Sequence, residues 1–419
     1  MKVLFVTTSE TGSGEAITAL HMAEMIAAKH ASFHFLSSIF AAQFFPKSLR
    51  PHMTVFTPIR AKNEKIWHDV VTKFRPNAVL FADYPLLFFS RGSVPLVSDR
   101  WVRSLESLDA AILTLDHLGY AQRTMSISFA PSHLSIHCET MPVLPKGMQI
   151  LLPCPIHEPA VVPGRNGTPF SYWHLPLRLP NGQRQQVRRR FLKDKRELLI
   201  FHSAPTWAWK IAERFGLPYY SFLGEILRHY LTGLPRPATL ISVNNGRLLN
   251  PCKHGETRIL NLGAVQKDKY ERLLLASDLM LTENMVSASL GKAICGMIPC
   301  AVLCNQYRIG ELSNMVKHKT LQSILWRMES IRLGSIYPYE VFPIWGKQDL
   351  IQLGVFRDNI FKEAFARIEV FGDEITRNQF LSLLTDSRTR AALRARQRRY
   401  LEELSALPDA FKVLHELVV

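Results

Sequence analysis

The stretch from Arg272 to Cys304 limits the fold more than any other part of the sequence. Its apolar run Leu279–Leu281 is followed by a short polar turn and then by apolar residues at helical spacing. Gly296 is placed to end that helix, and Pro299 precedes a second apolar run. A strand that leads directly into a helix leaves backbone N–H groups at the helix start without partners. The stretch therefore predicts a strand–loop–helix unit of a parallel sheet whose loop can hold an anion, with an ordinary unit of this kind as the alternative.

The same arrangement begins the chain. Val3–Val6 is a predicted strand, a polar loop with Gly12 and Gly14 follows, and a helix is expected over residues 17–26. Two glycines let a ligand approach the backbone closely, although a simple tight turn would use them too. Further predicted strands follow at the spacing of an α/β protein, at residues 33–36, 53–56, 78–81, 95–98, 110–114 and 150–152.

The second half repeats the pattern with predicted strands at 198–201, 239–243 and 258–262. Between the halves, residues 142–180 contain nine prolines, which disfavour long helices and interior strands. The chain is long enough for two domains with a core each. The prediction is an α/β fold with two Rossmann-like, doubly wound domains: residues 1–180, a connector at 181–196, a second domain at 197–385, and terminal helices at 386–419 that return toward the first domain.

Three motifs resemble the GT-B glycosyltransferase superfamily, which includes the lipid-linked N-acetylglucosamine transferase of peptidoglycan synthesis. LLLASDLMLTEN…SASLGKAICGMIPCAVL, within residues 273–303, is similar to its nucleotide-sugar-binding unit. The glycine loop at 12–14 resembles its first loop, and R-x-x-V-R-x-x-F-L at 184–192 resembles its connector helix. The resemblance implies two domains facing a central cleft and transfer of a sugar from a nucleotide-diphosphate donor. Many members place a ribose-binding Glu where this chain has Gly291, followed by Lys292.

Sugar transfer releases a nucleotide diphosphate, whose charge is stabilised by a metal held on carboxylates or by N–H groups, hydroxyls and cations. The sequence has no Asp-x-Asp pair and no His/Asp cluster with metal-ligand spacing. We therefore expect a metal-independent site that needs no cofactor. The candidate donor-binding residues are Gly12, Ser13, Gly14, Ser203, Thr206, Asn245, Gly246, Asn284, Ser287, Ser289 and Lys292.

The loop at 283–291 lacks the Glu-x7-Glu pair that many retaining members carry, which favours inversion. An inverting transfer needs a base within hydrogen-bond reach of the acceptor hydroxyl. Glu15, just after the glycine loop, is the first candidate catalytic residue. Asp83 and Asp99 follow predicted strand ends and are the next candidates, with Asp116 and His117 in the same kind of position. Any of these acids could instead serve as a turn or cap residue.

Composition narrows the setting of the reaction. The chain is 47% apolar and 21% charged, as in globular proteins, and no apolar run approaches the roughly 18 residues that span a bilayer. Six cysteines without paired spacing are expected to be reduced, which fits the cytoplasm. A net charge of +16 favours an anionic partner, which could be a nucleotide diphosphate, nucleic acid or the inner face of the membrane.

Two other functions fit the same sequence. One is a nucleotide-sugar 2-epimerase-like enzyme of the same fold, and the other is a non-enzymatic protein that binds a polyanion or nucleic acid. The acceptor stays open among a lipid-linked sugar, a metabolite, a protein and modified DNA. The basic cluster at 188–196 either belongs to the connector helix or contacts phosphates of a nucleic acid. The Arg-rich terminal helix at 387–404 is either a solvated face or a contact to a membrane or polyanion.

Overall fold

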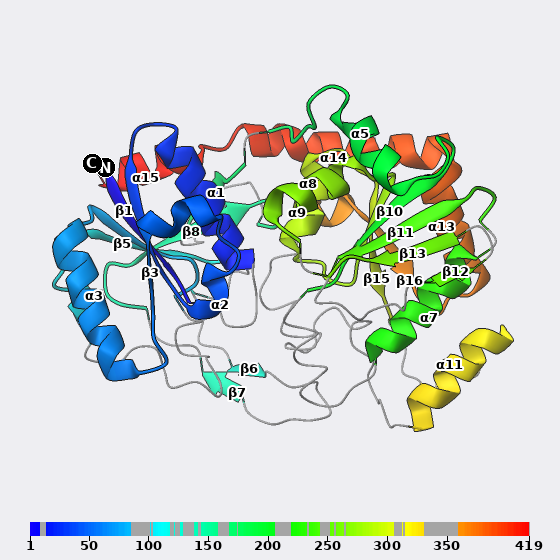
Figure 1. Ribbon diagram of the computed structural model, residues 1–419, viewed down its shortest axis with the longest axis horizontal. Coiled ribbons are helices and arrows are strands. Elements are labelled where there is room, and N and C mark those ends of the chain that lie inside the picture. Colours follow the sequence, from blue (N-terminus) through cyan, green and yellow to red (C-terminus); the bar gives the residue numbers. More distant parts are fainter. Residues whose placement is uncertain are drawn as a thin grey trace.

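The computed structural model contains two large β-sheets side by side, each flanked by helices (Figure 1). It describes residues 1–418 except 9–13, 85–100, 102–103, 118–120, 122–125, 129–137, 141–143, 158–166, 174, 206–218, 233, 244–251, 255–256, 264, 306–311, 313–314 and 331–358. None of the described helices is both long enough and apolar enough to cross a membrane. The predicted strand at 95–98 lies outside the described residues.

The first sheet has the strand order β3-β2-β1-β4-β5-β8-β9, and each neighbouring pair in it is parallel. Side chains of the interior strand β1 alternate between two layers, with Phe5 packed toward helix α1 and Val6 toward helix α3. Burial on both faces explains why this strand reads as a continuous apolar run. The elements are β1 (Lys2–Thr7), α1 (Gly14–Ala27), β2 (Ser32–Ser37), α2 (Ile39–Ala42), β3 (Met53–Val55), α3 (Arg60–Phe74), β4 (Ala78–Phe81), β5 (Ala111–Leu115), β8 (Gln149–Cys154) and β9 (Thr168–Ser171), with a separate hairpin of β6 (Ser126–Ser128) and β7 (Cys138–Thr140).

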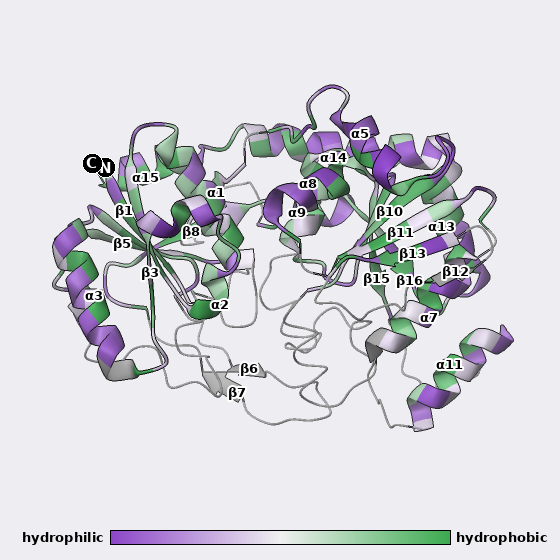
Figure 2. Cartoon of the chain, in the orientation of Figure 1, coloured by the Kyte–Doolittle hydropathy of each residue, from purple (hydrophilic) through white to green (hydrophobic). Residues whose placement is uncertain are grey.

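The second sheet has the order β12-β13-β11-β10-β14-β15-β16, and only the edge strand β12 is antiparallel to its neighbour. Figure 2 shows that the strands are mainly hydrophobic and that several helices carry both hydrophobic and hydrophilic residues. The elements are β10 (Leu198–Ser203), α7 (Tyr219–Leu231), β11 (Ala238–Val243), β12 (Cys252–His254), β13 (Thr257–Asn261), α8 (Lys267–Ala276), β14 (Leu279–Thr282), α9 (Ala288–Cys295), β15 (Cys300–Cys304), α11 (Lys319–Ser330), β16 (Ala366–Glu369) and α13 (Glu374–Thr385).

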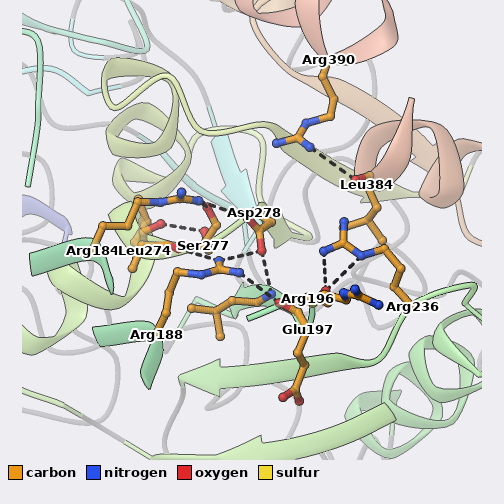
Figure 3. A network of polar contacts seen from close by, with 12 residues as sticks. Arg184, Arg188, Arg196, Glu197, Arg236, Leu274, Ser277, Asp278, Leu384 and Arg390 are labelled. Carbon is orange, nitrogen blue, oxygen red and sulfur yellow. Dashed lines mark hydrogen bonds and ion pairs between the residues drawn. The ribbon is translucent and has the colours of Figure 1, made fainter. Parts of the chain in front are cut away.

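Helix α5 (Gln183–Phe191) connects the two sheets along the chain and is fixed to the second one. Arg188 and Arg184 donate to the two oxygens of Asp278 over 2.7 and 3.0 Å, and the Leu199 N–H donates to the same carboxylate over 2.9 Å (Figure 3). Two arginines of the connector, Arg184 and Arg188, therefore hold it in place.

The chain then returns to the first sheet through α14 (Ser387–Ser405) and α15 (Ala410–Val418). The Tyr400 hydroxyl of α14 lies 3.2 Å from the backbone nitrogen of Ile156, and α15 packs against α1 and β9. Figure 1 shows α14 running along the upper edge of the second half and α15 beside α1. The domain boundaries expected from the sequence stay a prediction, although each sheet is made from one side of residues 181–196.

One expectation was wrong. Prolines were expected to disfavour interior strands in residues 142–180, but this segment supplies the interior strand β8, which was predicted at 150–152, and the edge strand β9. Pro153 is tolerated near the end of β8, and Pro169 stands in an edge strand where a missing N–H costs least. One hydrophobic cluster contains residues of both sheets, such as Phe5 and Phe201, and each half also has a cluster of its own. Four buried cysteines are free thiols: Cys154, Cys295, Cys300 and Cys304.

Candidate functional site

Three parallel strands of the second sheet end side by side and bring polar residues to one edge. His202 of β10 is in register with Ser242 of β11 and with Leu281 of β14. Ligands of open α/β sheets bind beyond the carboxyl ends of such strands. Thr206, Asn245 and Gly246, which were predicted for this edge, lie outside the described residues.

A cluster of hydroxyl groups lies at this edge. The Tyr270 hydroxyl on α8 lies 2.6 Å from Ser203 Oγ and 2.5 Å from Ser289 Oγ. Burial raises the pKa of Tyr270 to about 12, so the phenol stays protonated near neutral pH. Two serines that the sequence placed in separate loops are thus brought together, and the tyrosine that joins them was not predicted.

The turn between β14 and α9 is shaped by its own side chains. Thr282 donates to the carbonyl of Ser203 over 2.9 Å, and Asn284 Oδ1 accepts from the Val286 N–H over 3.1 Å. Ser287 Oγ accepts from the Ser289 N–H over 3.1 Å and caps α9. The predicted residues Asn284 and Ser287 therefore use side-chain oxygens to define where the helix begins.

A buried acid–histidine pair lies below this turn. Glu283 Oε2 lies 3.1 Å from His202 Nε2, and His202 Nδ1 lies 3.1 Å from Ser242 Oγ. The three residues are 1%, 0% and 0% exposed, and Glu283 Oε1 has no hydrogen-bond partner in the described part of the chain. This pair was not predicted from the sequence. The available signal was a titratable residue at the end of each of two apolar runs.

The Lys292 side chain of α9 is part of an ion pair. Its ammonium is paired with Glu271 of α8 and lies 5.6 Å from the centroid of the Trp173 ring. Lys292 is 6% exposed, so its charge needs a partner. Burial alone would raise the pKa of Glu271, but hydrogen bonding from His21 and the charge of Lys292 lower it to about 2. Glu271 already neutralises Lys292 in this arrangement, and the role of Lys292 toward a diphosphate stays a prediction.

Glu271 also belongs to a contact between the two halves of the molecule. His21 Nε2 on α1 lies 3.5 Å from Glu271 Oε1, and Lys267 Nζ on α8 lies 2.6 Å from Glu24 Oε2 on α1. Gly291 is part of the same contact, because a Cβ there would lie 2.6 Å from Pro155 Cγ. Only a glycine lets α9 approach this closely.

The first sheet places several predicted residues at its own carboxyl edge. Gly14 opens α1, with Glu15 in the first turn, and Asp83 is 4% exposed just after β4. Gly12, Ser13 and Asp99 lie outside the described residues. The structure therefore brings Glu15 and Asp83 to the ends of the adjacent strands β1 and β4.

His117, directly beyond the neighbouring strand β5, has a defined protonation state. Burial lowers the pKa of His117 to about 4, and the charge of His157 acts in the same direction. The ring donates to the carbonyl of Ala82, and Nε2 has no hydrogen-bond partner among the described residues. The donor is therefore Nδ1, and the neutral ring presents a lone pair on Nε2. No three metal-binding side chains are grouped anywhere in the described ranges.

Comparisons with known proteins bear on this geometry. A family model described as "Family of unknown function (DUF6365)" matches residues 22–419. No curated protein matches the chain. Three solved structures are similar over the whole chain: spinosyn forosaminyltransferase SpnP (TM-score 0.54, 11% identity, 99% of that chain), spinosyn rhamnosyltransferase SpnG (0.52, 12%, 99%) and glycosyltransferase VinC in complex with dTDP (0.50, 11%, 98%), each covering 100% of this chain. The expected GT-B fold is confirmed.

Proposed function

The chain belongs to DUF6365, a family of unknown function, and we propose that it is a glycosyltransferase acting on a nucleotide-diphosphate sugar. The similar proteins SpnP, SpnG and VinC are glycosyltransferases, and one SpnG structure holds the spinosyn aglycone. Because the sequence identity is low, the structural similarity supports the fold alone. The proposed activity therefore rests on the residues at the edge of the second sheet.

The observation that carries the proposal is the hydroxyl cluster of Tyr270, Ser203 and Ser289. These groups come from three elements and meet beside the start of α9, where the helix dipole favours an anion. Neutral donors can hold a diphosphate without a metal ion. Metal independence is therefore part of the proposal, on the basis of this donor set and of the missing Asp-x-Asp pair.

We place the base for an inverting transfer at the edge of the first sheet. Glu15 and Asp83 remain candidates, and His117 joins them because its neutral ring has an accepting nitrogen. A base must be unprotonated at the working pH and able to reach the acceptor hydroxyl. A lowered pKa leaves His117 unprotonated near neutrality.

Nucleotide binding tests the donor site. We expect UDP or dTDP to raise the melting temperature both with and without EDTA, because bound ligand stabilises the folded state by mass action. The Tyr270→Phe variant removes the bridging hydroxyl and should lose most of this nucleotide-induced shift. Tyr230→Phe is the matched control, since its hydroxyl donates over 2.8 Å to the Val370 carbonyl on the other face of the sheet.

Three results would contradict the proposal. Stabilisation that disappears in EDTA would indicate a metal-dependent site. Equal shifts for Tyr270→Phe and wild type would move the donor away from the hydroxyl cluster. Conversion of a sugar nucleotide to its free 2-epimer without any acceptor would favour the epimerase-like alternative.

A further inference from the structure

Much of the positive charge of this protein is concentrated in two helical segments. Residues 183–196 and 387–405 together contain thirteen Lys and Arg against three Asp and Glu. They therefore carry +10 of the net charge of +16 in 33 of the 419 residues. The nucleotide site described above uses none of these residues.

Both segments belong to the same layer of the fold. Helix α5 packs against α8 and α14 packs against α9, and these four helices contribute to the core on one face of the second sheet. The Gln397 amide of α14 donates to the Ile298 carbonyl over 2.8 Å, which fixes α14 to the end of α9. Figure 1 shows both helices along the upper edge of the second half, and Figure 2 shows their hydrophilic outer faces.

Some of these charges already have structural partners, and they can be set aside. Arg184 and Arg188 bind Asp278, and Arg396 Nε donates to the Glu363 carbonyl over 2.7 Å. Arg399 lies 3.9 Å from Glu363 Oε2, Arg390 donates to the Leu384 carbonyl over 3.5 Å, and Arg388 interacts with Asp386. The remaining group is exposed and forms no ion pair with an acid in the described part of the chain. It comprises Arg189, Arg190, Lys193, Lys195, Arg196, Arg394 and Arg398, which we call the basic surface.

We propose that the basic surface binds an anionic lipid bilayer, independently of the sugar transfer. The surface draws its charges from helix α5, the loop that follows it and helix α14, which suits the spread charge of phospholipid headgroups. Single-stranded nucleic acid is less well matched, because binding it requires exposed aromatic side chains for base stacking. The two aromatic residues of these segments, Phe191 and Tyr400, both pack into the core.

Vesicle flotation tests this inference directly. The full chain is mixed at low ionic strength with vesicles of phosphatidylcholine alone or with added phosphatidylserine. We expect binding only to the anionic vesicles and release as sodium chloride is raised. Each basic residue near such a surface contributes roughly a fivefold gain in partitioning, so the triple variant Arg189→Gln, Arg190→Gln, Lys193→Gln should bind about a hundredfold more weakly.

A matched variant distinguishes the effect of the basic surface from the effect of the total net charge. Lys62→Gln, Lys65→Gln and Lys73→Gln remove the same three charges from exposed positions on α3 of the first sheet. This control should bind nearly as well as wild type, and both variants should melt at the wild-type temperature. Absence of binding to anionic vesicles, or equal loss in the two variants, would overturn the inference. Retention on duplex DNA without vesicle binding would assign the surface to nucleic acid instead.

Discussion

Replacement of Lys292 by Met distinguishes two roles for this residue. Before the structure, the ammonium was expected to neutralise a leaving diphosphate, and its loss was expected to spare the fold. In the structure it is paired with Glu271 and lies over Trp173. The substitution keeps most of the aliphatic stem of Lys292 but removes the ammonium that pairs with the Glu271 carboxylate. We therefore expect the main effect to be on stability.

The size of the effect follows from burial. Breaking a fully buried ion pair by removing one partner costs about 3–5 kcal/mol. The Lys292 side chain is 7% exposed, but that of Glu271 is 28% exposed and keeps its contact with His21. Solvent at Glu271 reduces the expected cost to about 2–3 kcal/mol. For a cooperative unit of 419 residues, 1 kcal/mol corresponds to about 1 °C, so the melting temperature should fall by roughly 2–3 °C.

Thermal melting of four variants measures this effect. Lys292→Met should be destabilised, and Glu271→Gln should be destabilised similarly because it leaves the buried Lys292 ammonium without an ion-pair partner. The double variant should recover part of the loss, since neither charge is left unpaired. Lys269→Met, at an exposed position on α8, is the control. A wild-type melting temperature for Lys292→Met together with lost nucleotide binding would refute this reasoning and restore the diphosphate role.

Two further predictions concern packing and pH. Gly291→Ala should lower stability by about 1–3 kcal/mol in denaturant unfolding, because its Cβ would meet Pro155. Gly14→Ala should be tolerated, since nothing lies within 4 Å of a Cβ there, and equal losses would contradict the packing argument. For His117 the pKa falls from an ordinary 6.5 to about 4, so the unfolded chain binds the proton first as pH falls. Stability should drop by up to about 3 kcal/mol between pH 6.5 and 4, and His117→Gln should remove that part of the pH dependence.

The sequence predicted the strands better than it predicted the site. Leu279–Leu281 was recognisable because interior parallel strands are buried on both faces and read as apolar runs. By contrast, β8 was expected only in part, because its Pro153 and the surrounding prolines argue against an interior strand. The sequence therefore identified those strands that are buried on both faces and lack proline.

The contacts of the site could not be predicted in the same way. Ser203 and Ser289 were expected as loop residues near a ligand, but Tyr270 joins them from a helix on which it reads as an ordinary apolar position. Lys292 is similar, because its partner Glu271 is 21 residues away and on another helix. Charge is visible in a sequence, whereas the residue that neutralises it depends on how the helices pack.

Two kinds of interaction hold the two halves of the molecule together: exposed ion pairs and buried apolar packing. Ion pairs between the halves, such as Lys267–Glu24, involve a Glu24 side chain that is 49% exposed, so salt screens them and each contributes little. The core that runs from Phe5 to Phe201 is buried and is not screened by salt. Raising the ionic strength should therefore loosen the contact between α1 and α8 without separating the two sheets. Rotation of the halves relative to each other has to deform this shared core, which makes it costly.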